Sequence, residues 1–271
     1  MKGIKLLSTA LIILLSLVVL FPFFYALLGS FFSASDFAST PAKLWPTTFK
    51  VSNYLKVLTH RYFLTYIFNS LLTGVLGSFI RIIIGVLAAY AFAYLRFPFS
   101  RFIFAFIVAT LFIPSDLLLI QNYITIQKLG LIDTYLGIIS TSLLPAAQIL
   151  MLRQFFLSVP SSLHDSAVMD GAGDYTFISK ILLPLSKAVV SSLLLQSFVT
   201  IFNSYLWPLL VTNKPRMRTV QVGITMLGYA ESLNYGPIFA AIVIVFVPFL
   251  IIFILMRKRI MKALTRGYMY A

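Results

Sequence analysis

The sequence has no cysteine, only two histidines and only seven acidic side chains among 271 residues. Without cysteine the chain can form neither a disulfide bond nor a thiolate metal site. His60 and His164 lie far apart in the sequence, so we expect no histidine-based metal or catalytic centre. We therefore predict that this chain itself holds no metal, no cofactor and no thiol- or histidine-based catalytic residue.

Motifs for nucleotide binding and hydrolysis are also missing. None of the thirteen glycines is followed by lysine, so the phosphate-binding loop G-x-x-x-x-G-K-[ST] does not occur. The patterns H-E-x-x-H, G-x-S-x-G and C-x-x-C are absent too. Any ATP-driven activity would therefore need a partner subunit that binds ATP and Mg²⁺.

What the chain has in abundance is apolar sequence. Hydrophobic residues make up 60% and charged residues 10%, and the mean hydropathy is +0.98, as expected of an integral membrane protein. Several runs reach the length of about 20 residues that crosses a bilayer. They predict an all-α membrane bundle with six spans, at approximately 6–30, 66–95, 102–121, 136–156, 182–206 and 237–256.

Three prolines are expected to shape these spans. Pro22 would kink the first span, whose apolar part is longer than the roughly 7–15 apolar residues of a signal peptide. Pro114, together with Asp116, would break the third span, and Pro145 would interrupt the fourth. The segment 214–235 is expected to be an outer loop, and a short amphipathic helix is expected from Ser52.

The basic residues mostly flank the apolar runs. Net charge is 21 − 7 = +14. If the N-terminus lies inside the cell, the inner segments hold more Lys and Arg than the outer segments, as the positive-inside rule requires. The predicted location is therefore the cell membrane, crossed several times, with both termini and the loop 157–180 in the cytoplasm.

The segment Pro160–Leu185, PSSLHDSAVMDGAGDYTFISKILLPL, is the main ordered polar interruption of the C-terminal half. A helix is predicted from Ser162 to Met169, with Ser161 or Ser162 as its N-cap. Gly171 and Gly173 predict a sharp turn, because glycine adopts positive φ readily. A second helix is expected to start near Tyr175.

This segment resembles the EAA motif of ABC-importer permeases, roughly P-x-x-L-x-E-A-A-x-x-D-G-A followed by F-x-x-I-x-L-P-L. The matching residues are Pro160, Leu163, Ala167, Asp170, Gly171, Ala172, Phe177, Ile181, Pro184 and Leu185. Asp165 replaces the glutamate of the motif.

In the family this loop is the coupling helix that docks into the cytoplasmic ATPase. The resemblance thus implies that the coupling residues are Leu163, Asp165, Ala167, Asp170, Gly171 and Ala172. The alternative is an ordinary interfacial helix between two spans, in which Asp165 suits the positive end of the helix dipole and Asp170 caps the next helix.

The connector QNYITIQKLGLIDTYLG at 121–137 also resembles the family, although Asp133 alone is interpreted as a helix N-cap or first-turn anion. The resemblance covers nearly the whole chain and points to the carbohydrate-uptake branch. It implies a type I importer fold in one transmembrane domain, 1–271. It also implies a second homologous permease, two ATPase subunits and an extracytoplasmic substrate-binding protein as partners.

The substrate is indicated by resemblance alone. The stretches PLSK at 184–187 and NSYLWPLLVT at 203–212 look most like permeases for glycerol-3-phosphate, with a neutral sugar or oligosaccharide as the alternative. Asn203 and Trp207 would then lie near the substrate pathway. An amide in an apolar span needs a partner, whereas Trp207 is equally well explained as an anchor at the membrane interface.

Arg81 lies near the middle of the second predicted span, where a cation costs about 2.5–3.5 kcal/mol. It should therefore face the bundle interior. One interpretation pairs it with a carboxylate of the partner permease or with free helix carbonyls. The other places it in the pathway, where it would meet an anionic substrate such as a phosphate.

Two other classes of membrane protein are disfavoured. An intramembrane enzyme needs converging acids, histidines or serines within the bilayer, and only Arg81 and Asp116 are candidates for such a site. An ion-coupled carrier would have inverted repeats and intramembrane carboxylates, and neither is evident.

Overall fold

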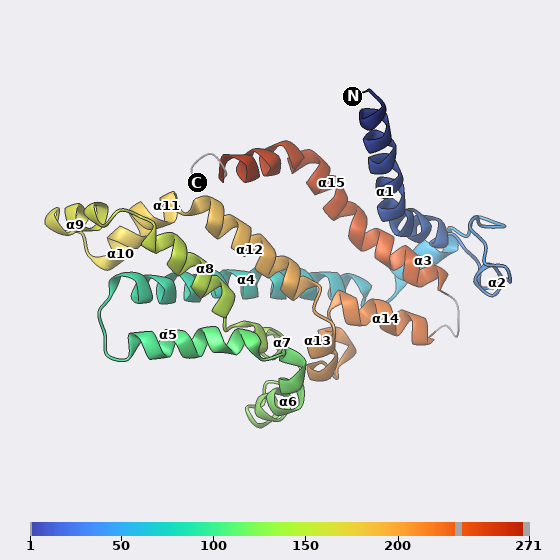
Figure 1. The fold of residues 1–271 in the computed structure, drawn as a ribbon. Coiled ribbons are helices and arrows are strands. Elements are labelled where there is room, and N and C mark those ends of the chain that lie inside the picture. Colours follow the sequence, from blue (N-terminus) through green and yellow to red (C-terminus); the bar gives the residue numbers. More distant parts are fainter. Residues whose placement is uncertain (1, 231–234, 268–271) are drawn as a thin grey trace. The chain divides into compact units, whose positions relative to one another are not determined.

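The computed structural model describes residues 2–230 and 235–267, and within them it contains helices and no strand (Figure 1). The all-α prediction is confirmed for these residues. The chain divides into two compact units. The first comprises 1–67 and 220–261, and the second comprises 68–219 and 262–271.

Among the described residues, two helices are long and apolar enough to cross a membrane unbroken, α1 (Lys2–Gly29) and α4 (Phe63–Tyr94). They coincide with the first two predicted spans, and α1 continues through Pro22 as one helix. The last predicted span lies in α15 (Gly236–Gly267). Its described apolar part, Gly236–Ile251, is shorter than a full span. The number of six spans therefore stays a prediction.

The predicted third and fourth spans are bent pairs of helices. α5 (Ser100–Ala109) and η1 (Thr110–Phe112) meet η2 (Ser115–Leu118) and α6 (Leu119–Lys128) at 98°. The cause is local, because Ile113 is extended (φ −91°, ψ 114°) before Pro114, as residues before proline tend to be. Similarly, α7 (Tyr135–Ile139) and η3 (Ser140–Ser142) meet α8 (Ala146–Leu157) at 55° around Pro145. Both predicted breaks are confirmed.

The predicted fifth span, 182–206, is wrong as a single helix. The chain passes through α10 (Asp174–Phe177), a π-helical turn η4 (Ile178–Leu182) and α11 (Leu183–Leu185) before α12 (Lys187–Phe202). The two halves meet at 84°. Pro184 has no amide hydrogen to continue the ladder, and Ser186, which lies between the two halves, donates from both its amide (2.8 Å) and its hydroxyl (2.6 Å) to the Leu182 carbonyl. Helix α12 ends at Phe202, which leaves 203–205 outside any helix.

The predicted outer loop 214–235 is wrong in part, because it contains η5 (Pro215–Met217) and α14 (Val220–Ala230). Val220 and Val222 are fully buried, and Ile224 is 8% exposed. A helix that is buried on most sides has no polar face, and the alternation of a polar and an apolar face is the pattern that predicts a helix from sequence. Without that pattern, the basic residues at the start of the segment favoured a loop. Residues 231–234 of the predicted loop lie outside the described residues.

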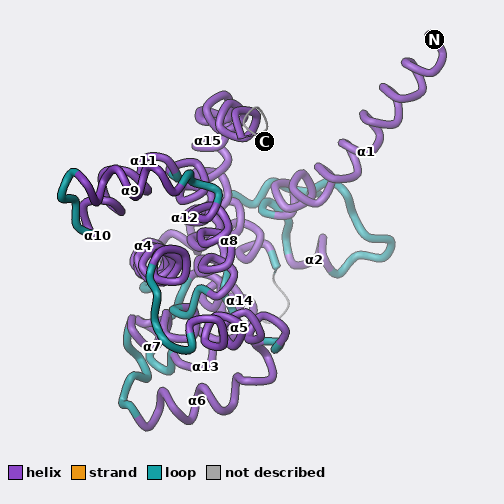
Figure 2. Tube along the Cα trace, turned by 60° about the vertical axis from the view of Figure 1, so that its left-hand side comes forward, coloured by secondary structure: helices purple, strands orange, loops and turns teal. Residues whose placement is uncertain are grey.

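The core of the second unit is built on α4, and α8 and α12 lie alongside that helix (Figure 1, Figure 2). Its buried side chains are Ile82, Val86, Ala89, Tyr90, Leu152, Phe156, Ala167, Phe177, Ile178, Leu182 and Leu193. Gly77 permits the close approach of α12, since a Cβ there would lie 2.7 Å from Cδ1 of Ile201. Helix α4 therefore contacts both the bundle helices and the segment 157–180.

The connection that follows α1 is organised around a buried carboxylate, Asp36, in α2 (Ala34–Phe37). The residue is 1% exposed. Its oxygens accept hydrogen bonds from Thr47 Oγ1 (2.6 Å), Lys43 Nζ (2.9 Å) and the Ser33 amide (3.0 Å). The hydrogen bond from Thr47, with those from Ser33 and Lys43, holds the pKa of Asp36 well below its usual range against the opposing effect of burial.

We expect Asp36→Asn to loosen the segment 33–47 by about 1–3 kcal/mol, the cost of leaving buried donors unsatisfied. Because the folded-state pKa is lowered, the carboxylate stabilises the segment above its unfolded pKa of about 3.9, and this is lost only as pH falls through the folded-state pKa. Hydrogen exchange of the segment should therefore rise in the variant equally at mildly acidic and neutral pH. The control Asp116→Asn removes an exposed charge and should leave it unchanged. Unaltered hydrogen exchange in Asp36→Asn would contradict the conclusion that the Asp36 carboxylate organises the segment 33–47.

Candidate functional site

The central helix of the segment 157–180 is α9 (Ser161–Met169). It begins one residue before the predicted start, and the predicted serine cap is wrong. Pro160 occupies the N-cap position, and no side chain accepts a hydrogen bond from the first-turn amides. Proline at this point directs the chain into the helix (φ −55°, ψ 130°), so the hydroxyls of Ser161 and Ser162 are not needed there.

Helix α9 ends in a Schellman turn at Gly171. The Gly171 amide donates to the Val168 carbonyl (3.0 Å), and the Ala172 amide donates to the Ala167 carbonyl (2.9 Å), which is the paired pattern of this turn. Gly171 has φ +77°, and a Cβ there would meet nothing within 4 Å. Glycine is therefore favoured here for its backbone conformation, and the prediction for Gly171 is confirmed. The prediction for Gly173 is wrong, since it is extended (φ −77°, ψ 169°) at the start of α10.

The coupling residues predicted from the motif divide into two groups. Ala167 is 6% exposed, and both it and Ala172 pack into the α4 core. Leu163 is 42% exposed and the Asp165 side chain 71% exposed, and Asp170 is exposed as well. The alanines thus fix the helix to the protein, while the other side chains are free to meet a partner.

The interpretation of Asp170 as a cap of the next helix is wrong. The N-cap of α10 is Gly173, and no side chain bonds to the first amides of α10. Asp165 lies 3.8 Å from His164 Nδ1. Among the described residues, neither carboxylate accepts a hydrogen bond from an amide of the segment, so their acidic groups remain exposed.

An aromatic cradle that sequence reasoning missed holds α9 and α10 against the end of α4. The His164 ring stacks on Tyr94 with centroids 5.1 Å apart and meets Phe177 edge-on at 4.9 Å. The Tyr90 hydroxyl donates to Asp174 over 2.7 Å, and the Tyr94 hydroxyl donates to the Phe156 carbonyl over 3.0 Å. The available signal was the spacing of Tyr90 and Tyr94, which places both on one face of α4.

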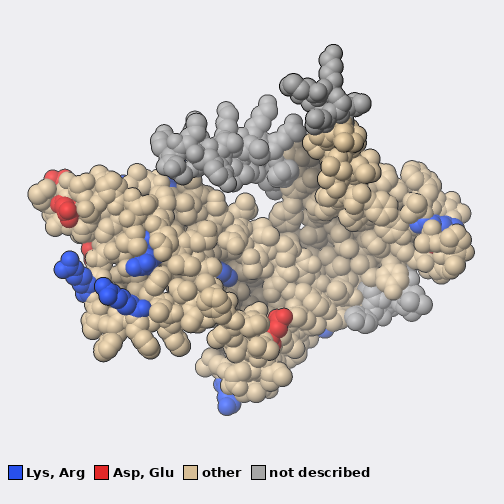
Figure 3. Space-filling view, viewed as in Figure 1, with Lys and Arg blue, Asp and Glu red and all other residues tan. Residues whose placement is uncertain are grey.

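The outer surface of this segment combines apolar and acidic side chains. Val168, Met169 and Tyr175 are 56%, 81% and 83% exposed. Figure 3 shows acidic side chains gathered at the end of the second unit where Figure 1 places α9 and α10. An exposed apolar ridge with a polar rim is the usual composition of a protein interface.

Arg81 lies in the middle of α4, as predicted, and is half-buried. Its Nε is enclosed without a hydrogen-bond partner, and the two terminal nitrogens are not among the enclosed unpartnered atoms. No described residue accepts a hydrogen bond from Arg81. The end of the guanidinium therefore reaches the surface of the chain, and no carbonyl of the described residues serves as its partner. Pairing with a carboxylate of the partner permease stays a prediction.

Asn203 and Trp207 occupy different environments. Asn203 follows α12 as its C-cap and is exposed, so it does not lie inside a helical span. Trp207 lies on α13 (Leu206–Val211), is 5% exposed, and donates from Nε1 to the Gly137 carbonyl over 2.9 Å. It packs with Ile126, Ile138 and Val211. The described contacts of Trp207 are thus packing contacts inside the chain, and its role in a pathway stays a prediction.

The interpretation of Asp133 as a helix cap is wrong. Thr134 is the N-cap of α7, and its hydroxyl accepts from the Gly137 amide. Asp133 has φ +58°, a conformation that Asp tolerates better than most residues. From there its carboxylate accepts a hydrogen bond from the Lys214 amide over 2.8 Å. Asp133 therefore ties the connector 121–137 to the segment after α13.

We expect Trp207→Phe to lower the stability of the second unit by about 1–2 kcal/mol, because the Gly137 carbonyl loses its donor. The apparent KM for uptake by assembled complexes should stay unchanged, since the indole does not reach the surface. Thermal unfolding and uptake kinetics of the purified complex test this. A raised KM with unchanged stability would instead support a direct role of Trp207 in the pathway.

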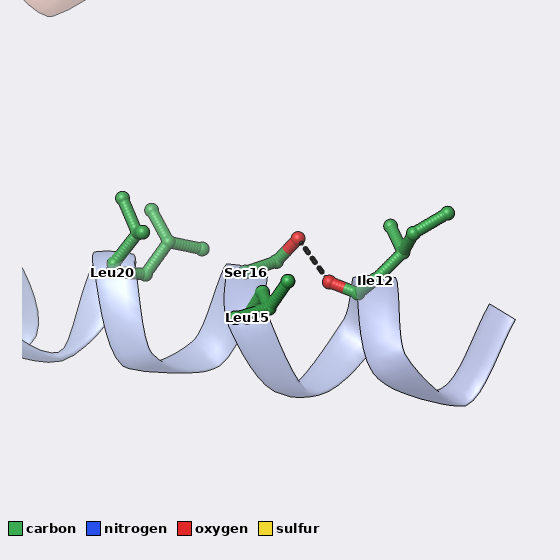
Figure 4. A pocket seen from close by; sticks show the side chains of 5 residues that line it. Ile12, Leu15, Ser16 and Leu20 are labelled. Carbon is green, nitrogen blue, oxygen red and sulfur yellow. Dashed lines mark hydrogen bonds between the residues drawn. The ribbon is translucent and has the colours of Figure 1, made fainter. Parts of the chain in front are cut away.

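A shallow recess lies along α1, lined by Ile12, Leu15, Ser16, Val19 and Leu20 (Figure 4). Its one polar side chain, Ser16, donates back to the Ile12 carbonyl over 2.7 Å. The Ser16 hydroxyl keeps only its acceptor lone pairs, and the other four lining side chains are apolar. The recess therefore suits lipid or another apolar helix and is not a candidate substrate site.

Comparisons with known proteins found similar permeases of transport systems. The sn-glycerol-3-phosphate transport system permease protein UgpE of Brucella abortus (strain 2308) is 31% identical over 269 residues, covering 96% of this chain and 95% of the relative. The diacetylchitobiose uptake system permease protein NgcG of Streptomyces coelicolor is 30% identical over 266 residues, covering 96% and 87%.

A crystal structure described as a bacterial ABC transporter involved in the import of the acidic polysaccharide alginate has the same fold. The TM-score is 0.81 at 24% identity, and the match covers 95% of this chain and 96% of the other. Residues 81–265 match the family described as binding-protein-dependent transport system inner membrane component. This chain belongs to that family of ABC-importer permeases.

Proposed function

We propose that this chain is one of two permease subunits of an ATP-driven importer for glycerol-3-phosphate or a related phosphodiester. The observation that carries the choice of substrate is Arg81, whose guanidinium reaches the surface of the chain in the middle of α4. Full-length similarity to permeases named for sn-glycerol-3-phosphate supports the same choice. A planar guanidinium binds a phosphate through two parallel hydrogen bonds.

A neutral oligosaccharide is the second candidate, favoured by one observation. The relative named for diacetylchitobiose uptake is about as similar as those named for glycerol-3-phosphate. In that case Arg81 would be a structural residue whose partner belongs to the second permease.

The proposed topology has six spans in one transmembrane domain, with both termini and residues 157–180 in the cytoplasm. The charge bias of the sequence supports this orientation. The proposed assembly contains a second homologous permease, two ATPase subunits that bind ATP and Mg²⁺, and an extracytoplasmic substrate-binding protein. The name of the family, which includes dependence on a binding protein, supports the last of these.

The proposed ATPase contacts are the exposed side chains of α9 and its turn. Leu163, Asp165 and Asp170 would meet the ATPase together with the ridge of Met169 and Tyr175. Ala167, Gly171 and Ala172 would shape and anchor the segment. The burial of Ala167, the packing of half-buried Ala172 against the α4 core and the positive φ of Gly171 support this division.

The proposed residues that line the pathway are Arg81 and Asn203, and Trp207 would support them without contacting the substrate. Arg81 would bind the phosphate, and exposed Asn203 would contact the polyol. Trp207 would hold α13 in place through its contacts inside the chain. The substrate would thus be recognised by one charged and one neutral hydrogen-bonding group.

The test is uptake by the complete complex in proteoliposomes that contain ATP. Labelled glycerol-3-phosphate should accumulate when its binding protein is present, and an unlabelled phosphodiester should compete for uptake while a neutral disaccharide should not. A complex with a hydrolysis-deficient ATPase is the control and should accumulate nothing. Competition by the disaccharide alone would favour the second candidate.

A further inference from the structure

The helix α3 (Ser52–Thr59) in the first unit has three distinct sides. Asn53 and Val57 are buried at 4% and 0% exposure. Val51, Leu55 and Leu58, spaced so that they share one side of a helix, are 64%, 64% and 51% exposed. The remaining side carries Ser52, Lys56 and Thr59, which are exposed and polar. The exposed surface of α3 is therefore itself divided into an apolar strip and a polar strip.

The position of α3 follows from its contacts with the end of α1. The Asn53 side-chain amide donates to the carbonyls of Ser30 and Phe32, each over 2.9 Å. The Tyr54 and Ser30 hydroxyls lie 2.7 Å apart. Both carbonyls belong to the turn that directly follows Gly29, the last residue of α1, so α3 is fixed to the point where α1 ends.

The length of α1 sets the depth of that point. Its apolar part, Leu7–Gly29, has 23 residues, which at about 1.5 Å per residue extend roughly 34 Å. The hydrocarbon core of a bilayer is about 30 Å thick. The end of α1 therefore lies at the boundary between hydrocarbon and headgroups, and α3 lies at the same depth.

Aromatic and basic side chains beside α3 suit this boundary. Trp45 and Phe49 are 59% and 55% exposed and meet edge-on with centroids 6.0 Å apart. Phe49 in turn contacts Phe31 at the end of α1, 5.5 Å between centroids. Lys50 is exposed nearby. Tryptophan is enriched where membrane meets water, and lysine there contacts lipid phosphates.

We propose that α3 is a membrane-surface helix whose apolar strip Val51, Leu55 and Leu58 inserts into the lipid, with Trp45 and Phe49 at the same depth. The partner is the phospholipid surface at the C-terminal end of α1, which is the outer surface in the proposed topology. Helix α1, to whose end α3 is fixed, exposes its apolar window as well, because none of that window is buried in the chain. A helix of this kind fixes how deeply the end of α1 and the adjoining segment 33–47 lie in the membrane.

The absence of cysteine from the chain permits a direct test. Single cysteines at Leu55, Leu58 and, as the matched control on the polar strip, Ser52 would carry a nitroxide label. The complete complex, with cysteines of other subunits replaced, would be reconstituted in phosphatidylethanolamine–phosphatidylglycerol vesicles and required to keep its basal ATP hydrolysis. Collision rates would be measured with oxygen, which concentrates in lipid, and with a water-soluble nickel chelate.

The oxygen-to-nickel ratio at positions 55 and 58 should be several times that at position 52. Adding the loaded binding protein should change neither the ratio nor the mobility of the labels at 55 and 58. Equal, water-like ratios at all three positions would overturn the proposal. Immobilisation of the labels at 55 and 58 by the binding protein would also overturn it and would identify the strip as a protein-docking surface. Neither outcome depends on which solute is transported.

Discussion

Replacing Gly171 with valine is expected to abolish the stimulation of ATP hydrolysis by the loaded binding protein, while the membrane bundle stays folded. Gly171 has φ +77° in the turn that ends α9. A left-handed conformation costs an ordinary L-residue about 1–2 kcal/mol, and a β-branched residue more. The turn would open, Ala172 would leave the α4 core, and α9 would lose its orientation. We expect at least about a tenfold loss of stimulated hydrolysis, which corresponds to 1.4 kcal/mol.

Two matched variants separate conformation from side-chain volume. A Cβ at Gly171 meets no atom within 4 Å, so bulk alone does not account for a defect. Gly171→Asn should therefore retain most of the stimulation, because asparagine tolerates the left-handed region. Gly173→Ala, at an extended position with open space around it, should behave as wild type. Full stimulation in Gly171→Val, or equal loss in all three variants, would contradict this account of the turn.

Replacing Arg81 with glutamine is the second change with a large expected effect. A charge-assisted hydrogen bond contributes about 1.5–3 kcal/mol, so uptake of a phosphorylated substrate should fall about 10-fold to 150-fold. Assembly and basal ATP hydrolysis should persist, because no described residue depends on Arg81 for a hydrogen bond. Uptake by proteoliposomes, measured beside basal hydrolysis, tests this.

The controls for Arg81 address charge and position separately. Arg81→Lys keeps the charge but loses the planar fork, so an intermediate rate is expected. Arg101→Gln removes an exposed arginine at the start of α5 and should leave uptake unchanged. If Arg81→Gln transports the phosphorylated substrate normally, or if assembly alone fails, Arg81 is a structural residue.

The predictions for Gly171 and Arg81 both involve helix α4. Helix α4 carries Arg81 at its middle, and Tyr90 and Tyr94 at its C-terminal end hold the segment of α9 and α10. An α-helix of this length is stiff compared with a loop. A displacement at the middle of α4 would therefore reach the coupling segment through the Tyr90–Asp174 bond and the His164 stack.

The sequence predicted those parts of the fold that depend on apolar length and on proline. Helices α1 and α4 and the breaks at Pro114 and Pro145 follow from these local rules. It did not predict where tertiary contacts override local pattern. Helix α14 is buried on most sides and so lacks a polar face. The fifth predicted span bends by 84° at Ser186, two residues after Pro184.

In the candidate site, too, local residue chemistry predicted some features, while contacts between distant residues decided others. The conformation of Gly171 followed from the chemistry of glycine, whereas the roles of Asp133 and Asp170 did not follow from residue type. Asp133 binds the Lys214 amide, which is distant in sequence, and no local pattern encodes such a contact. His164 was set aside as an isolated histidine, although its stack on Tyr94 and Phe177 fixes α9 in place.

The central claim is that the segment of α9 and α10 is the cytoplasmic contact with an ATPase, and thiol labelling of Met169→Cys tests it most directly. Met169 is 81% exposed at the end of α9, and Phe99, 78% exposed beside α5, offers a control position on the same predicted side. A membrane-impermeant thiol reagent should react with both cysteines only from the cytoplasmic face. Binding of the ATPase should slow the reaction at 169 and leave position 99 unaffected. Reaction at 169 from the outer face, or equal rates at 169 with and without the ATPase, would contradict the claim.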